Sequence, residues 1–230
     1  MGGQLQQKNW NCRQCMHHLE VMVRTKAWKS APKPVFFWYQ MAAREEAEIG
    51  GQLKANGIKS AIEVGCGSGR VLRAVLLAAP QVTRIVGVEQ DAVMAEFART
   101  FFIGEKRVEI TATMPKNGKI DASLSMLNTA GNQAAPWAFV GNLFSLSTKL
   151  TIFSVYKKGV EAERRAIYEH FGHTGIREKN GCIMLNDGIV QNFTSASFSF
   201  EDVKAAVEQL TKKYEIIDAS HLNYVIVLRH

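Results

Sequence analysis

The sequence predicts an α/β fold built on a mostly parallel sheet of seven strands, with helices on both faces and an antiparallel strand near the C-terminus. Apolar segments of strand length alternate with helical periodicity from residue 58 to residue 171, which is typical of a parallel sheet. A glycine-rich turn joins the first strand to the first helix of this alternation, as in nucleotide-binding βαβ units. Two late apolar segments, Tyr214–Ala219 and Tyr224–Leu228, are joined by a connection too short for a crossover, so they must pair antiparallel.

Two helices are predicted before the first strand. Apolar positions recur with helical spacing over residues 11–28, and the prolines Pro32 and Pro34 follow that segment. A longer helix is predicted over Phe36–Leu53, with Gly57 after its end. We therefore expect a helical cap over residues 1–57 and a sheet-containing domain over residues 58–230.

The remaining elements follow from the same periodicities. The predicted strands before the closing pair are Ser60–Val64, Thr83–Glu89, Val108–Thr113, Ala122–Leu127, Lys149–Tyr156, Cys182–Leu185 and Ile189–Phe193. The predicted helices are Gly69–Ala79, Ala92–Phe101, Pro136–Leu146, Val160–Phe171 and a last one that begins near Phe198, with Ser199 as its N-cap, and ends at Leu210. The strands that flank Asn186-Asp187-Gly188 are expected to form a hairpin inserted after the fifth strand of the sheet.

Composition indicates a globular domain, since 47% of the 230 residues are hydrophobic and 21% are charged. No apolar run is long enough to span a bilayer, and the polar start of the chain lacks the apolar core of a secretion signal. The four cysteines, Cys12, Cys15, Cys66 and Cys182, do not form a disulfide framework, so we expect a cytoplasmic protein with reduced thiols and no membrane partner.

The net charge of +7 permits an anionic partner such as nucleic acid, but no dense block of lysine and arginine with interleaved aromatic residues occurs. A solvated basic surface is the favoured interpretation. Cys12, Cys15, His17 and His18 have the residue types of a zinc site, yet they lie in one short segment without a second ligand pair, so no metal is predicted.

The glycine loop carries the functional signal. Gly65, Gly67 and Gly69 follow the first strand, and glycine at such a turn permits positive φ and close approach of a ligand. The helix that follows offers free backbone N–H groups to an anionic group. A dinucleotide site has its third glycine where this chain has Arg70, and the preceding acid, Glu63, suits a ligand with positive charge.

The segment Glu63-Val64-Gly65-Cys66-Gly67-Ser68-Gly69 resembles motif I of the class I S-adenosylmethionine-dependent methyltransferases, which have a Rossmann-like fold. Glu89, at the end of the second strand, matches the acid of that family that binds the ribose. The segment Asn128-Thr129-Ala130-Gly131-Asn132 resembles a stretch of small-molecule N-methyltransferases, and the paired final strands match the reversed hairpin of the family. The resemblance covers roughly residues 36–230.

The resemblance implies S-adenosylmethionine as cofactor, with S-adenosylhomocysteine as product. The residues expected to bind it are Glu63, Gly65, Cys66, Gly67 and Gly69 beside the methionine part, Glu89 and Gln90 at the ribose, Thr113 and Met114 at the adenine, and Leu127 and Asn128 at the sulfonium. Cys66 is interpreted as a small loop residue rather than a nucleophile, since no base lies near it in sequence.

Methyl transfer is an in-line displacement, so side-chain carbonyls near the methyl group can hold an amine in line. Asn128, Asn132 and Tyr39 are the candidate catalytic residues, although Asn128 and Asn132 also suit simple turn chemistry beside Gly131. The candidate substrate-binding residues are Trp38, Tyr39, Asn132, Tyr156 and Tyr168. The alternative for the aromatic residues is an ordinary place in the core.

We therefore expect a methyltransferase that acts on a nitrogen of a small molecule, such as an amino acid or a natural-product amine. The basic charge keeps an RNA or protein acceptor open as an alternative, and a non-catalytic module that binds S-adenosylmethionine is a second alternative. The oligomeric state is left open by the sequence.

Overall fold

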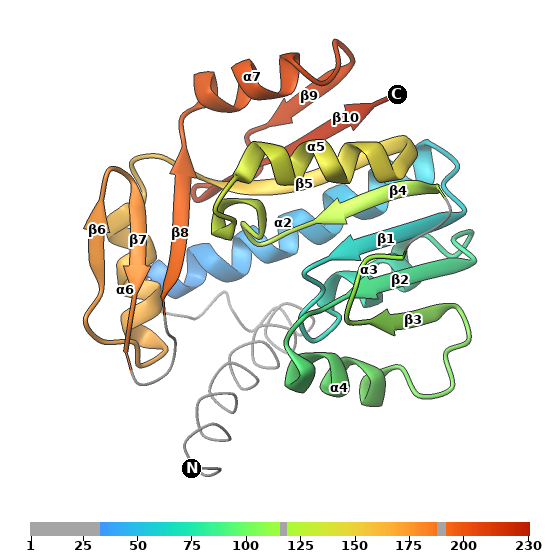
Figure 1. Ribbon diagram of the computed structural model, residues 1–230, viewed down its shortest axis with the longest axis horizontal. Coiled ribbons are helices and arrows are strands. Elements are labelled where there is room, and N and C mark those ends of the chain that lie inside the picture. The colour runs from blue at the N-terminus through green and yellow to red at the C-terminus, as the bar shows by residue number, and fades with distance from the viewer. Residues whose placement is uncertain (1–32, 116–118, 188–191) are drawn as a thin grey trace.

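The computed structural model describes residues 33–115, 119–187 and 192–230. In these residues ten strands form one sheet (Figure 1). Seven follow the order β3-β2-β1-β4-β5-β10-β9. Their bounds are β1 Ser60–Val64, β2 Arg84–Val88, β3 Val108–Thr111, β4 Ile120–Ser125, β5 Ser147–Lys157, β9 Tyr214–Ile217 and β10 Asn223–Arg229. Strands β1 to β5 are parallel to one another, while β10 is antiparallel to both β5 and β9.

The expected strand number of seven is wrong for the whole sheet, because three further strands join it. These are β6 Arg177–Lys179, β7 Cys182–Leu185 and β8 Phe193–Phe198, which pair antiparallel with one another. Strand β5 extends past the end of β4, and its last residues, Tyr156 and Lys157, pair with β8. The inserted segment is thus hydrogen-bonded to the main sheet at the carboxyl end of β5.

The expected strand Ile189–Phe193 is also corrected. The strand that pairs with β7 begins at Phe193, opposite Leu185, and runs to Phe198. Its central residues 194–197 are Thr-Ser-Ala-Ser, which lack the apolar alternation that signals a strand. The interval that the sequence analysis assigned to the strand lies largely within residues 188–191, outside the described part of the chain.

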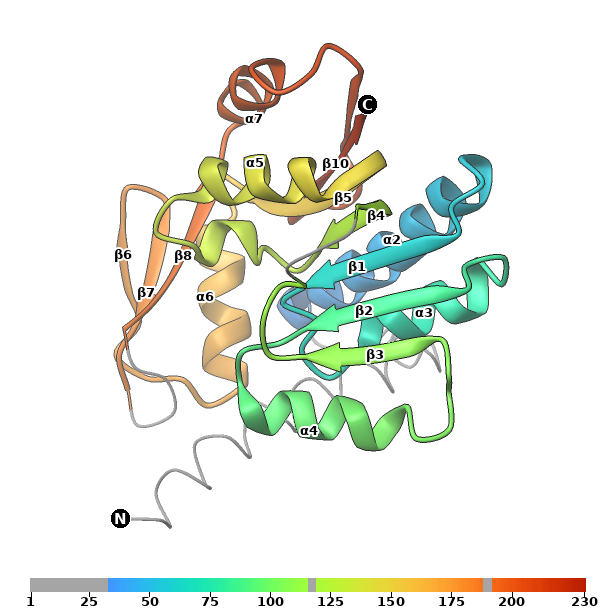
Figure 2. The same cartoon turned by 45° about the vertical axis from the view of Figure 1, so that its right-hand side comes forward.

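Helices cover the two faces of the main sheet (Figure 2). Helices α2 Lys33–Ala55, α3 Arg70–Ala78 and α4 Ala92–Phe101 lie on one face, and α5 Pro136–Leu146 and α7 Phe200–Glu208 lie on the other. Along β5, Leu150 and Ile152 pack toward α2 and α3, whereas Phe153 and Val155 pack toward α5 and α7, as the period of two in a strand requires. Helix α6, Glu161–His170, contacts α2 and β7.

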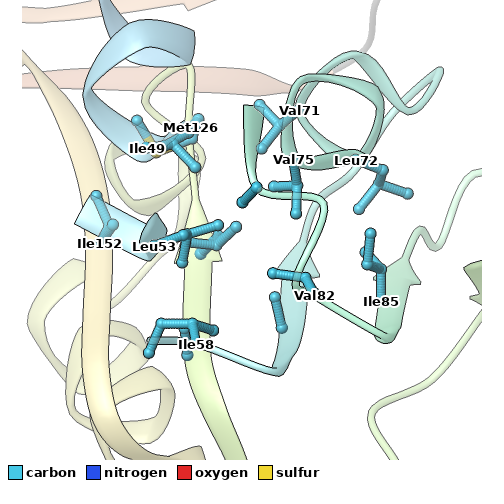
Figure 3. Packing of buried hydrophobic residues seen from close by; sticks show 14 of the residues in the cluster. Ile49, Leu53, Ile58, Val71, Leu72, Val75, Val82, Ile85, Met126 and Ile152 are labelled. Carbon is cyan, nitrogen blue, oxygen red and sulfur yellow. The ribbon is translucent and has the colours of Figure 1, made fainter. Parts of the chain in front are cut away.

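The core between α2, α3 and the sheet consists mainly of aliphatic side chains (Figure 3). Ile49 and Leu53 of α2 contribute to the same buried cluster as Val75 of α3 and Ile152 of β5. Burial of each such side chain stabilises the fold by roughly 1.5–3 kcal/mol. The described part of the expected cap region is therefore packed into the core of the sheet domain.

The expected longer N-terminal helix is observed as α2, and the expected helix over residues 11–28 lies outside the described residues. The predicted N-cap of α7 is confirmed, because Ser199 and Asp202 form a reciprocal capping box. Among the described helices, none is long and apolar enough to cross a membrane.

Candidate functional site

The site lies where the parallel strands β1, β2 and β4 end. The glycine loop after β1 folds over the end of β2, because the N–H groups of Gly65 and Cys66 both donate to the carbonyl oxygen of Val88, at 2.8 and 3.1 Å. Carboxyl ends of adjacent parallel strands share one edge of the sheet, which is the usual ligand position in open α/β folds.

Glycine is required at two positions of this loop. Gly65 has a φ of +78°, and a Cβ there would lie 2.7 Å from Cγ2 of Thr129. Gly69 has a φ of +90°, and a Cβ there would lie 2.4 Å from the ring of Phe102. The backbone thus takes a left-handed conformation that side chains disfavour, with close neighbours as a second constraint.

Glu89 holds the loop from the end of β2. Its carboxylate accepts hydrogen bonds from the N–H of Gly67 at 2.8 Å and from the N–H of Asp91 at 2.9 Å. Asp91 in turn caps α4 by accepting from the N–H groups of Val93 and Met94. Glu89, which the sequence predicts to bind a ribose, therefore fixes the glycine loop relative to β2 and α4.

Two hollows open on this edge, with volumes of about 250 and about 540 Å³. Gly65, Glu89 and Thr129 line both of them. The smaller hollow is lined further by Glu63, Cys66, Gly67, Arg70, Val71, Asp91, Met94, Met126 and Leu127. The larger is lined further by Val64, Val88, Gln90, Ala112, Thr113, Met114, Asn132, Gln133, Phe139, Asn142 and Leu143. Two hollows that meet at Glu89 suit a ligand with two lobes joined by a diol-bearing ring.

The floor of the smaller hollow is acidic. Glu63 is buried, and burial raises its pKa to about 8, while the nearby Arg70 opposes that shift. Arg70 itself is engaged by two other carboxylates, since it donates to Glu45 at 2.8 Å and to Glu46 at 3.0 Å. Burial raises the pKa of Glu46 as well, against the pull of Arg70.

The residues present fit a ligand with a positive charge. Oε2 of Glu63 and Oγ of Ser68 are buried and have no hydrogen-bond partner among the described residues. A buried polar atom without a partner is costly, so these two atoms are ready to accept or donate to a bound group. The chemistry of an ammonium or sulfonium beside Glu63 matches this acceptor.

Nine of the predicted cofactor residues line the hollows: Glu63, Gly65, Cys66, Gly67, Glu89, Gln90, Thr113, Met114 and Leu127. Gly69 and Asn128 line neither, and of the predicted acceptor residues Asn132 alone lines one. Three residues that line the larger hollow were not predicted from the sequence: Thr129, Gln133 and Asn142. Thr129 lies within the Asn-Thr-x-Gly-Asn stretch and Gln133 directly follows it, so their place beside this stretch could have predicted them as site residues.

The side chain of Asn128 is occupied by the protein. Its oxygen accepts from the N–H of Tyr156 at 3.0 Å, and its nitrogen donates to Oγ of Ser195 at 2.9 Å and to the carbonyl oxygen of Ala196 at 3.0 Å. Asn128 is buried and has a φ of +60°. Its amide therefore joins the end of β4 to β5 and β8, whereas Asn132 borders the larger hollow.

The predicted aromatic residues gather behind Leu127. Trp38, Tyr39 and Tyr156 are buried in one cluster that Leu127 packs against. Tyr168 is half-buried on α6, with its ring against His173 and Phe193. Burial raises the pKa of Tyr156, so its hydroxyl is neutral at ordinary pH.

Cys66 behaves as a buried loop residue. Burial raises the pKa of its thiol, and the carboxylates of Glu63 and Glu89 raise it further. A thiol held in that form is a poor nucleophile. Within the described ranges, no group of three or more acidic, cysteine or histidine side chains could hold a metal. The segment with Cys12, Cys15, His17 and His18, for which no metal is predicted, lies outside the described residues.

Comparison with solved structures defines the class of fold. The chain is similar to an S-adenosylmethionine-dependent methyltransferase from Clostridium acetobutylicum, with a TM-score of 0.55 and 10% identity, over 81% of this chain and 90% of that one. It is similar to magnesium protoporphyrin IX methyltransferase from Synechocystis with bound S-adenosylhomocysteine, with a TM-score of 0.56 and 13% identity, over 82% and 84%. It is also similar to the methyltransferase domain of bacterial CtHen1, with a TM-score of 0.57 and 14% identity, over 81% and 98%.

No protein-family model and no curated protein sequence matches the chain. The fold is that of the class I S-adenosylmethionine-dependent methyltransferases, which confirms the expected fold class. The three added strands β6, β7 and β8 distinguish this chain from a plain seven-stranded sheet.

Proposed function

We propose that the protein is a methyltransferase that uses S-adenosylmethionine and transfers the methyl group to a nitrogen of a small molecule. The observation that carries this proposal is the placement of Glu63, the glycine loop and Glu89 around two adjoining hollows at the carboxyl edge of the sheet. The described neighbours with this fold are methyltransferases, and one of them holds S-adenosylhomocysteine.

The donor half of the site divides between the two hollows. Glu63 and the glycine loop would hold the methionine part in the smaller hollow, and Glu89 would accept from the ribose hydroxyls where the hollows meet. Gln90, Thr113 and Met114 line the larger hollow on the side of β2 and β3, where an adenine would lie. The bound donor supplies an activated methyl group, so the protein has to orient the acceptor and exclude water.

The acceptor half rests on fewer groups. Asn132 lines the larger hollow, and its neighbour Gln133 does so too, with its amide nitrogen donating to the carbonyl oxygen of Thr129 at 3.0 Å. The oxygen of that Gln133 amide is then available to accept from an amine. An amine must lose a proton before attack, and solvent at the open edge can take it.

The free thiols of Cys66 and Cys182 fit the predicted cytoplasmic location.

Binding and transfer are tested separately. Calorimetry with S-adenosylmethionine, S-adenosylhomocysteine and NAD should show binding of the first two alone. Transfer is then measured with methyl-labelled donor and a fractionated small-molecule extract, and labelled product in an amine fraction is the expected result. Preferential binding of NAD would overturn the proposed donor site.

The outcomes of the transfer assay separate the alternatives. Label in RNA or protein fractions, with a steep salt dependence of binding, would replace the small-molecule acceptor by a macromolecule. Tight donor binding without transfer into any fraction would indicate a binding module. The net charge of +7 is the reason to include RNA in the assay.

A further inference from the structure

A second buried arginine lies over Tyr156, next to the cluster that Leu127 packs against. Arg164, on α6, has 1% of its surface exposed. Its Nη2 donates to the carbonyl oxygen of Ser195 at 2.7 Å, and its guanidinium lies 4.3 Å from the centre of the Tyr156 ring. Its Nε and Nη1 atoms are buried and have no hydrogen-bond partner among the described residues.

The charge of Arg164 is not neutralised by a carboxylate of the described chain. Arg70 provides the contrast, because it is equally buried and pairs with both Glu45 and Glu46. A buried guanidinium without an anion loses several kcal/mol of hydration, and one carbonyl and one aromatic ring restore only part of it. The fold thus carries a buried positive charge whose natural partner is an anion.

The position of Arg164 connects it to the site. Tyr156, under the guanidinium, belongs to the buried cluster that Leu127 packs against, and Leu127 lines the smaller hollow. Ser195 links the same region from β8, since its Oγ accepts from the Asn128 amide and its carbonyl oxygen accepts from Arg164. Helix α6 and strands β7 and β8 stand together at the end of the sheet toward which β1 and β4 point (Figure 1).

We infer that the methyl acceptor carries an oxyanion group, a carboxylate or a phosphate, that pairs with Nη1 of Arg164. The inference rests on the proposed function, because it assigns the substrate class of the same site. Nη1 carries N–H donors without a partner among the described residues, and a charge-assisted hydrogen bond to an oxyanion oxygen is the strongest that they can make. The cationic donor would then face Glu63, and the anionic acceptor would face Arg164.

Arg164 lines neither hollow, so an acceptor would reach Nη1 by displacing a neighbouring side chain. Tyr168 lies one helical turn beyond Arg164 on the same face of α6 and is half-buried, so its ring is the one that an acceptor entering there would displace. The predicted substrate role of Tyr168 is consistent with that position.

The first test needs no turnover. The Nε–H signal of Arg164 is identified in the NMR spectrum of the protein with S-adenosylhomocysteine by its absence in Arg164→Lys. Titration with acetate or methyl phosphate should shift this signal saturably, and the more effective probe tells carboxylate from phosphate. The neutral probe acetamide should leave it unchanged. No saturable shift with either anion, or an equal shift with acetamide, would overturn the inference.

The second test measures the acceptor. Methyl-labelled products from the small-molecule extract should be retained on a strong anion exchanger, and Arg164→Gln should lower the initial rate of label transfer into that retained fraction about 10- to 100-fold. Arg165→Gln, the exposed neighbour, is the matched control and should retain the activity. Unchanged affinity for S-adenosylhomocysteine shows that Arg164→Gln is folded.

The outcomes separate the inference from the proposed function. Products that pass through the exchanger, or equal transfer by Arg164→Gln, overturn the anionic acceptor and leave the methyltransferase intact. Donor binding without any transfer overturns the proposed catalysis, and the NMR titration then decides on the anion site by itself.

Discussion

Arg70 donates a hydrogen bond of 2.8 Å to the carboxylate of Glu45, and this buried ion pair joins the start of α3 to the middle of α2. The other oxygen of Glu45 accepts from three further groups: Oγ of Ser154 at 2.6 Å, Nδ2 of Asn223 at 3.1 Å and the N–H of Leu127 at 3.3 Å. Leu127 has a φ of +50°, so Glu45 helps to hold a left-handed residue beside the smaller hollow. One carboxylate thus connects α2, α3, β5, β10 and the loop after β4.

Removal of the Glu45 charge should destabilise the protein strongly. Glu45→Gln leaves the buried Arg70 with Glu46 as its partner, and a broken buried pair costs about 3–5 kcal/mol. We expect a loss of about 3 kcal/mol in the free energy of unfolding, measured by urea denaturation. Glu48→Gln, on the outer side of the same helix, is the control and should change stability by about 0.5 kcal/mol or less.

A double variant tests whether the charge pair is the cause. Glu45→Gln combined with Arg70→Gln removes both charges, so the loss should be smaller than the sum of the two single losses. Additive losses would indicate that packing, and not the ion pair, determines the effect of Glu45.

These contacts mark the limit of what the sequence predicts. The glycine loop and Glu89 were predictable because strand, turn and helix are contiguous, and the contact of Glu89 with Gly67 spans 22 residues within one βαβ unit. Glu45 contacts groups that are 25, 82, 109 and 178 residues away. In the sequence it is one of several acids on an amphipathic helix, and periodicity does not distinguish a buried one from its exposed neighbours.

Asn128 illustrates the same limit at the site. The resemblance of its segment to small-molecule N-methyltransferases predicted a role near the methyl group, and its place beside Gly131 kept simple turn chemistry as the alternative. Its partners Ser195 and Ala196 are 67 and 68 residues away, on a strand whose small polar residues gave no signal. The burial of Arg164 was equally hard to predict, because its hydrogen-bond acceptor is the carbonyl oxygen of Ser195 on β8.

Asn128 and Asn132 should therefore respond differently to truncation. Asn128→Ala leaves the buried N–H of Tyr156 without its acceptor, at about 1–3 kcal/mol, so the free energy of unfolding should fall by at least that amount. Asn132→Ala should change stability by about 1 kcal/mol or less while lowering methyl transfer. Denaturation and the transfer assay on both variants make the comparison, and a stable but inactive Asn128→Ala would support the catalytic prediction for Asn128.

Glu89 should control donor affinity. Glu89→Ala removes the acceptor at the junction of the two hollows and releases the N–H groups of Gly67 and Asp91. Loss of hydrogen bonds to a charged group costs about 1.5–3 kcal/mol, so the Kd for S-adenosylhomocysteine should rise by about tenfold or more. Glu96→Gln, exposed on α4, should bind as the unmodified protein does. Calorimetry on the two variants decides, and equal affinities would place the ribose elsewhere.

Glu63 should make the stability of the donor-free protein fall as pH rises. Its pKa in the folded protein is about 8, against 4.5 for a free glutamate side chain, so between these pH values the folded state binds the proton more strongly than the unfolded state. Stability is therefore lost through that window, at no more than about 1.4 kcal/mol per pH unit from this group. Glu63→Gln removes the contribution. Unfolding free energies measured from pH 5 to pH 8 should show a steeper decline in the unmodified protein than in Glu63→Gln. Equal slopes would show that the pKa of Glu63 is not raised in the folded protein.

The same proton should leave when the donor binds. A positive group beside Glu63 favours its carboxylate and lowers its pKa, so binding near pH 7 should release protons, and affinity should rise from pH 6 to pH 7.5. Calorimetry in phosphate and in imidazole buffer at pH 7 measures the release from the difference in binding heat, and Glu63→Gln should abolish it. S-adenosylhomocysteine keeps the ammonium but lacks the sulfonium charge. Release with both ligands would place the ammonium beside Glu63, release with S-adenosylmethionine alone would place the sulfonium there, and release with neither would mean that Glu63 does not face the donor.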